Sequence, residues 1–131
     1  MVIGTSALIA ILPGEPAAPC IAATIENHTL RLLSAASLLE TSIVIEARKG
    51  EPGGRELDLL LYRAEIDVVA VDRDQAEAAR AAWRRFGKGR HPAAPNYGDC
   101  FAYALAKTRH LPLLYHGNDF LRTDIEPVAM S

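Results

Sequence analysis

The sequence predicts an α/β fold, with a mostly parallel sheet between two layers of helices. Short apolar segments rich in branched residues alternate along the chain with longer segments whose apolar residues recur at helical spacing. This alternation is typical of βαβ units, which place parallel strands side by side and helices on both faces of the sheet. No repeat, low-complexity tract or shift of composition divides the 131 residues. We therefore expect a single three-layer α/β/α domain over residues 1–131.

The first third of the chain predicts two strands and two helical pieces. Residues 1–3 are wholly apolar and predict a short buried strand. Gly4, Thr5 and Ser6 then form a junction to a helix over residues 7–12, with Thr5 or Ser6 as its N-cap. Two prolines and a glycine end that helix at residues 13–16, and helical spacing returns at residues 21–25. Residues 30–34 predict the second strand.

The middle of the chain predicts a helix pair followed by a third strand. A helix over residues 37–48 begins with Ser37 and Glu40, which have the spacing of a capping box. We expect a loop at residues 50–54, because glycine and proline gather there, and an amphipathic helix at residues 55–64. Residues 66–71 are rich in valine and predict the third strand.

The last third predicts two helices, a strand and an irregular end. Residues 72–87 are alanine-rich and predict a helix, with Asp72 or Asp74 as N-cap and Gly87 as its stop. After a loop with several basic residues, a helix over residues 97–107 begins with Asn96 as a plausible N-cap. The remaining expectations are a fourth strand at residues 111–115, a tight loop at 116–119, one helical turn at 120–123 and an edge strand at 126–128.

Composition excludes several classes of function. The net charge of −2 gives no global attraction to nucleic acid, so any polyanion binding requires a local basic patch. Cys20 and Cys100 have no metal or redox spacing, and we expect free thiols in a reducing cytoplasm. The apolar residues 1–12 follow no basic residue and are too few to span a membrane as a helix. We therefore expect a cytoplasmic protein that does not enter membranes.

Three carboxylates follow the predicted strands. Glu40 and Asp99 lie near the starts of helices, and Asp119 follows the fourth strand. Each has a structural explanation, as a capping-box partner, a helix-dipole acid and a turn residue. Parallel strands, however, bring their carboxyl ends to one edge, where functional crevices form. Carboxylates gathered there repel one another unless a cation neutralises them, and oxygen ligands suit Mg²⁺ or Mn²⁺. Such an ion activates water for phosphodiester cleavage.

Four sequence blocks follow one another along the chain: Met-Val-Ile-Gly-Thr-Ser-Ala-Leu (1–8), Ser-Leu-Leu-Glu-Thr-Ser (37–42), Asn-Tyr-Gly-Asp-Cys (96–100) and His-Gly-Asn-Asp-Phe (116–120). In this order they closely resemble the PIN-domain ribonucleases, and within them the VapC toxins of type II toxin–antitoxin systems. The resemblance also covers residues 87–92 and 123–125. It implies a PIN-like fold in which Glu40, Asp99 and Asp119 are catalytic acids around Mg²⁺ or Mn²⁺. It also implies supporting roles for Asn96 and for the hydroxyl of Thr5 or Ser6.

Gly4 departs from the family pattern, in which an aspartate at this position is a metal ligand. A glycine has its own structural explanation, namely a tight turn between strand and helix. Because the other three blocks keep the family pattern, we interpret Gly4 as an inactivating substitution, either natural or introduced to permit expression of a toxic enzyme. We expect low or absent cleavage of RNA. One alternative is a natural pseudoenzyme kept for antitoxin and operator-complex binding. The other is a phospho-receiver domain, but this chain lacks the paired acids that such a domain needs after its first strand.

A basic patch and two apolar helices complete the predictions. The basic residues expected to bind RNA phosphates are Arg84, Arg85, Lys88 and Arg90. They could equally complement the C-terminus of a helix. We expect Trp83 to lie in the core rather than to stack on bases, and the apolar residues at 21–25 and 57–61 to pack in the core. The resemblance further implies a homodimer and a VapB-like antitoxin, whose C-terminal segment covers the acids and which alone contacts DNA.

Overall fold

The sheet is parallel throughout. The computed structural model describes residues 1–87, 97–118, 120 and 123–130. Within them, four short strands pair in the order β3-β2-β1-β4. Their bounds are β1 (Val2–Ile3), β2 (Leu32–Ser34), β3 (Asp67–Val69) and β4 (Leu113–Leu114). All four predicted strands are therefore present, each shorter than predicted. Pro127 forms a parallel bridge to Leu113, so the last segment does lie at the β4 edge.

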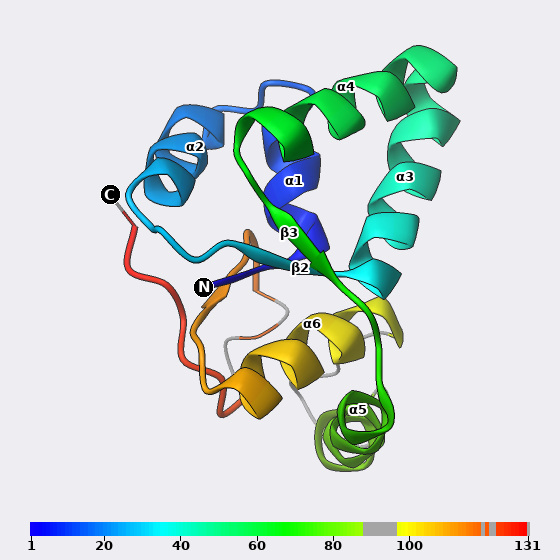
Figure 1. Cartoon of the computed structure of the whole chain (residues 1–131), viewed down its shortest axis with the longest axis vertical. Helices are drawn as coiled ribbons and strands as arrows, with labels where there is room; N and C mark the ends of the chain where they lie inside the picture. The colour runs from blue at the N-terminus through cyan, green and yellow to red at the C-terminus, as the bar shows by residue number, and fades with distance from the viewer. Residues whose placement is uncertain (88–96, 119, 121–122, 131) are drawn as a thin grey trace.

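Helices cover both faces of this sheet, as the sequence predicted (Figure 1). Their bounds are α1 (Thr5–Ile11), α2 (Ala18–Glu26), α3 (Ala35–Lys49), α4 (Glu51–Arg63), α5 (Arg73–Phe86) and α6 (Tyr97–Arg109). Helices α1 to α4 lie on one side of the sheet in Figure 1, and α5 and α6 lie on the other. In the described residues, no helix is long and apolar enough to cross a bilayer.

Alternation along the strands divides the core into two parts. Side chains at successive strand positions point to opposite faces. Val2, Leu32 and Leu113 pack against α5 and α6. The next residue of each strand packs on the opposite side, among residues of α1, α2 and α4. Ile21, Ile25 and Leu57 belong to this second part and are at most 2% exposed, which confirms that the two apolar helices pack in the core.

Two helices begin earlier than predicted because the N-cap lies where the preceding strand ends: Gly4 directly follows β1, and Ser34 is the last residue of β2. Gly4 is the N-cap of α1, so Thr5 and Ser6 lie inside the helix, and neither caps it. Ser34 is the N-cap of α3, and its hydroxyl accepts a hydrogen bond from the Ala36 amide at 3.3 Å. The predicted capping box is therefore wrong. Ser37 lies in the first turn and Glu40 in the second, where its carboxylate is available for other contacts.

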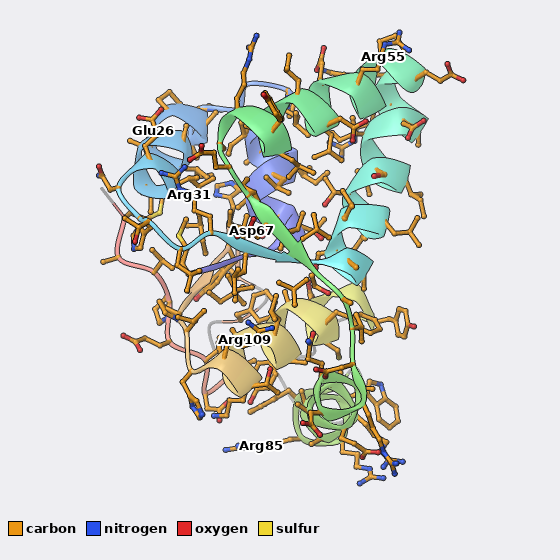
Figure 2. The ribbon with its side chains drawn as sticks, viewed as in Figure 1. Glu26, Arg31, Arg55, Asp67, Arg85 and Arg109 are labelled. Carbon is orange, nitrogen blue, oxygen red and sulfur yellow. The ribbon has the colours of Figure 1, made fainter. Side chains whose placement is uncertain are left out.

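Residues 51–54 of the predicted loop at 50–54 are helical. Gly50 alone makes the turn between α3 and α4, with a φ of +68° that favours glycine. Pro52 lies in the first turn of α4, where its missing amide costs no hydrogen bond. Arg31, just before β2, joins the ends of α4 and α2, because its guanidinium donates hydrogen bonds to the carbonyls of Ala64 and Glu26. Figure 2 labels Arg31 and Glu26.

Helix α5 has the predicted N-cap and a narrow buried face. The Asp72 carboxylate accepts a hydrogen bond from the Gln75 amide at 2.8 Å. Ala79, Ala82 and Phe86 recur at helical spacing and are buried. Trp83 lies at the edge of this face, and 44% of its surface is exposed. The prediction that Trp83 belongs to the core is wrong.

Candidate active site

The segments that follow β1 and β4 are tied together by hydrogen bonds. The Gly4 amide donates to the Leu114 carbonyl at 2.8 Å, which extends the pairing of the two strands. The Ser6 hydroxyl accepts a hydrogen bond from the His116 amide at 2.9 Å. The start of α1 therefore lies beside the loop that leads toward Asp119. Asp119 itself lies outside the described residues, as does the proposed N-cap Asn96.

The start of α1 also lies beside the first turns of α3. The Thr5 hydroxyl donates a long hydrogen bond, 3.5 Å, to the carbonyl of Ser37. The same carbonyl accepts a hydrogen bond from the Thr41 hydroxyl at 2.7 Å. Glu40 lies between these two α3 residues in sequence and is half-buried. Thr5 thus helps to position the helix that carries Glu40.

Glu40 reaches across to the helix that carries Asp99. A Cβ atom added to Gly98 would lie 2.5 Å from Oε1 of Glu40, and still closer to Oε2. The carboxylate of Glu40 therefore occupies the space left by the missing side chain of Gly98. Asp99 is the next residue, half-buried in the first turn of α6. The fold thus brings α3 and α6 together at the point where the two predicted acids lie.

The backbone at Gly4 does not require glycine. Its φ of −85° and ψ of 158° are extended values that any residue can adopt. An added Cβ would lie 3.2 Å from the Leu114 carbonyl oxygen, which is tight, while its next neighbours lie at 3.8 and 3.9 Å. A small shift would therefore admit a side chain. The explanation of Gly4 as a tight-turn glycine is not supported by this geometry.

The donor atoms at this edge match a hard divalent cation in type but are few in number. Glu40 and Asp99 offer carboxylate oxygens, which Mg²⁺ and Mn²⁺ prefer. Gly4 offers no side-chain ligand. Within residues 1–87, 97–118, 120 and 123–130, no three His, Cys, Asp or Glu side chains come together as a metal site. A complete set requires a further carboxylate, from Asp119 or from an acid restored at position 4.

Cys100 follows Asp99 in α6 and packs against Ala79 of α5. Its thiol is buried, and the pKa of Cys100 is raised by this burial and further by the negative charge of Asp99. Both cysteines are free thiols, as predicted. A thiol with a raised pKa stays protonated and is a poor metal ligand or nucleophile at neutral pH.

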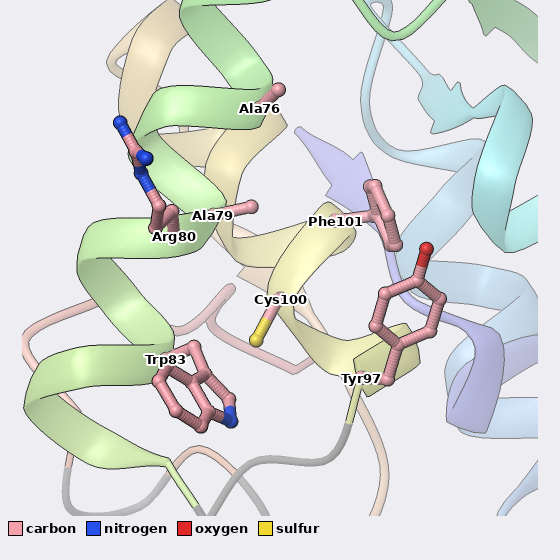
Figure 3. A pocket seen from close by; sticks show the side chains of 7 residues that line it. All are labelled: Ala76, Ala79, Arg80, Trp83, Tyr97, Cys100 and Phe101. Atoms are coloured by element: carbon pink, nitrogen blue, oxygen red, sulfur yellow. The ribbon is translucent and has the colours of Figure 1, made fainter.

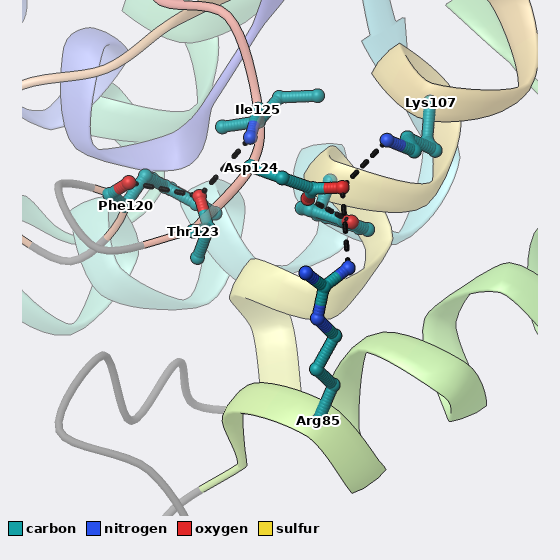
Figure 4. A network of polar contacts seen from close by, with 7 residues as sticks. Arg85, Lys107, Phe120, Thr123, Asp124 and Ile125 are labelled. Carbon is teal, nitrogen blue, oxygen red and sulfur yellow. Dashed lines mark hydrogen bonds and ion pairs between the residues drawn. The ribbon is translucent and has the colours of Figure 1, made fainter.

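Asp124 is a polar centre that the sequence reasoning did not single out (Figure 4). Its carboxylate accepts hydrogen bonds from the Tyr103 hydroxyl and from Lys107 at 2.7 Å, and Arg85 lies 3.4 Å away. Partial burial would raise the pKa of Asp124, but these hydrogen bonds and the charges of Lys107 and Arg85 hold it below its usual value. Burial raises the pKa of Tyr103, and its hydrogen bond to Asp124 and the negative charge of that carboxylate raise it further, while the charge of Arg85 opposes the shift. In the sequence, the signal that could have identified Asp124 was its place in the block at residues 123–125.

The basic patch is partly neutralised within the described residues. Arg85 pairs with Asp124, and its guanidinium lies 4.8 Å from the centre of the Phe86 ring. Arg80 pairs with Glu77. Arg84 is exposed, whereas Lys88 and Arg90 lie outside the described residues. Arg85 therefore has a structural partner in the fold, in addition to any contact that it makes with RNA phosphates.

Two apolar grooves flank the N-terminal turn of α6. The first, which we call the aromatic groove, has a volume of about 340 Å³ and lies between α5 and α6 (Figure 3). It is lined by Ala76, Ala79, Arg80, Trp83, Tyr97, Cys100 and Phe101. The second, the α3 groove, has about 330 Å³ and is lined by Ala36, Leu39, Glu40, Ile43, Val44, Tyr97, Gly98 and Phe101. Its Leu39 and Ile43 are more than 60% exposed.

Comparison with known proteins gives concordant matches over nearly the whole chain. The family model described as PIN domain matches residues 1–126. Ribonuclease VapC30 of Mycobacterium tuberculosis is 62% identical over 130 residues, which cover 99% of each chain. The crystal structure of VapC20 of the same organism, titled a Sarcin-Ricin loop cleaving toxin, superposes with a TM-score of 0.77 at 16% identity over 95% of each chain. A toxin–antitoxin complex from Klebsiella pneumoniae gives 0.68 at 17% identity, over 94% of this chain and 92% of that one.

Proposed function

The chain belongs to the PIN-domain family, and within it to the VapC ribonuclease toxins, and from this membership we propose a Mg²⁺- or Mn²⁺-dependent endoribonuclease that Gly4 impairs. The observation that carries the proposal is the Glu40 carboxylate seated against Gly98, beside Asp99. It explains why two acids remote in sequence act at one place.

Glu40, Asp99 and Asp119 would hold the cation, with position 4 contributing nothing. A bound Mg²⁺ or Mn²⁺ supplies an activated water and neutralises charge on the phosphate that is cleaved. The chain's own part is to hold the acids. Helix α6 presents Asp99 in its first turn, where the macrodipole favours negative charge. Thr5 and Ser6 fix the neighbouring segments through Ser37 and His116.

The test is cleavage of RNA by the chain as it stands and by the Gly4→Asp variant, each with Mg²⁺ and with EDTA. The extended backbone at Gly4 supports a correctly placed aspartate. We expect the variant to cleave at least about 100-fold faster, since even an indirect partner of a metal ligand is worth 10- to 100-fold. Strong, EDTA-sensitive cleavage by the unchanged chain would contradict the impairment. No cleavage by either chain would favour the pseudoenzyme.

We further propose an antitoxin partner that covers this site; the proposal is supported by the likeness of the fold to a chain of a toxin–antitoxin complex. The α3 groove supports the antitoxin proposal, because its exposed Leu39 and Ile43 lie on the same helix as Glu40 and line the same groove. An apolar segment followed by a basic side chain would complement both features. Coexpression with a small protein encoded beside the chain tests the proposal. Ile43→Lys should abolish copurification, and Leu59→Lys, an exposed position on α4, should not.

A further inference from the structure

We propose that the aromatic groove binds one unstacked base of single-stranded RNA, next to the phosphate that is cleaved. The inference rests on the proposed ribonuclease function and deepens it by naming a base subsite. It concerns a different surface from the α3 groove, whose exposed aliphatic residues Leu39 and Ile43 belong to α3. Tyr97 and Phe101 separate the two grooves and line both of them.

The walls of the aromatic groove have the chemistry of a stacking site. Trp83 is 44% exposed and Tyr97 is 80% exposed, although both are large aromatic residues. Trp83 stands on α5 and Tyr97 on α6, with the Cys100 thiol between them at the floor (Figure 3). Proteins bind single-stranded RNA by stacking unpaired bases on such side chains. Ala76 and Ala79 keep the floor small, which leaves depth for a planar ring.

The Tyr97 ring is held in place by its neighbour. Its centre lies 5.0 Å from that of Phe101, and the two planes meet at 84°, an edge-to-face arrangement. This geometry is favourable for two aromatic rings. A ring that is fixed before binding loses little conformational entropy when a base stacks on it. The exposed face of Tyr97 is therefore prepared for contact.

The position and charge of the groove fit RNA. Tyr97 lies two residues before Asp99 in the same turn of α6, so a base in the groove would belong to a nucleotide close to the proposed cleavage point. Arg80 lines the groove and pairs with the exposed Glu77, and Arg84 is exposed four residues later on α5. Residues with this spacing share one face of a helix. Basic side chains there would contact phosphates on either side of the bound base. The volume of about 340 Å³ is in the range of small-molecule sites.

Trp83 allows a direct measurement, because it is the only tryptophan of the chain. The unchanged chain, in EDTA so that cleavage does not interfere, is titrated with a short oligoadenylate and separately with inorganic polyphosphate. We expect oligoadenylate to quench Trp83 fluorescence and polyphosphate to leave it unchanged. Equal effects of the two ligands would show that only charge is recognised and would overturn the proposal.

Substitutions of Tyr97 complete the test, with binding followed by the anisotropy of labelled oligoadenylate. Tyr97→Ala should weaken binding about tenfold, within the range found for one stacked base. Tyr97→Phe keeps the ring and should bind like the parent chain. Tyr62→Ala is the matched control, because Tyr62 is 82% exposed on α4, whose apolar face packs on the other side of the sheet. Since Tyr97 is so exposed, these variants should fold normally.

The outcomes separate this proposal from the ribonuclease proposal. If Gly4→Asp restores cleavage but Tyr97→Ala binds oligoadenylate as tightly as its parent, the base subsite is wrong and the ribonuclease proposal stands. If Tyr97→Ala instead changes only copurification with a protein partner, the groove is a protein interface and the subsite is again wrong. Quenching by oligoadenylate without cleavage by Gly4→Asp would support the subsite and count against the ribonuclease.

Discussion

Replacing Gly98 by alanine should inactivate the Gly4→Asp enzyme without unfolding it. The added Cβ would lie 2.5 Å from Oε1 of Glu40, whereas an ordinary contact begins at 3.4 Å. The carboxylate must therefore move by about 1 Å or more. A displacement of this size in a catalytic group can cost about 100-fold in rate. Stability should not fall, because alanine is favoured over glycine within a helix by up to about 1 kcal/mol.

The assay is cleavage of RNA at saturating Mg²⁺, together with thermal unfolding of each variant. Gly54→Ala in the same background is a matched control. Gly54 also lies in the first turn of a helix and faces a glutamate, since its added Cβ would lie 2.9 Å from Oε2 of Glu46. That glutamate is not among the proposed site residues. We therefore expect Gly54→Ala to cleave RNA at the parent rate.

Retention of the parent rate by Gly98→Ala would refute the reasoning, because it would show that the position of the Glu40 carboxylate beside α6 does not matter for catalysis. Equal losses in Gly98→Ala and Gly54→Ala would also refute it, since a general effect of added side chains would then explain both results.

Two further predictions concern stability. Asp124→Asn should lower the free energy of unfolding by about 1 kcal/mol, because a partly exposed network of charged groups contributes on this scale. Urea unfolding at pH 7 measures the difference. The pKa of Asp124 is lower in the folded chain than its ordinary value of 3.8. Its contribution to stability is therefore present above pH 3.8 and disappears as the pH falls below that value. If the free energies of unfolding of parent and variant differed by the same amount at pH 7 and at pH 2, this prediction would be contradicted. Leu57→Ala, at a fully buried position, should cost about 2–5 kcal/mol, and Leu59→Ala, 46% exposed on the same helix, should cost far less. Similar urea midpoints for these two variants would contradict the assigned faces of α4.

Sequence signals of short range gave the fold class, the number of strands and the approximate helices. Hydrophobic periodicity and the β-strand preference of residues such as Val68 and Val69 act over a few neighbours, so they can be recognised without the fold. Helix boundaries were less certain. Ser34 and Gly4, rather than the later hydroxyl residues, are the N-caps, because they stand at the point where a strand ends and the chain first turns into a helix.

By itself, the sequence determined the family, through four blocks in a fixed order, and identified Glu40 and Asp99 as candidate acids. Only the tertiary structure decided how these residues meet. The seat of the Glu40 carboxylate on Gly98 depends on how α3 packs against α6, which no local propensity specifies. The same is true of Trp83, whose exposure follows from the face by which α5 packs on the core. Contacts between remote segments arise from the packing of whole helices and sheets, and a residue's neighbours in sequence carry little information about them.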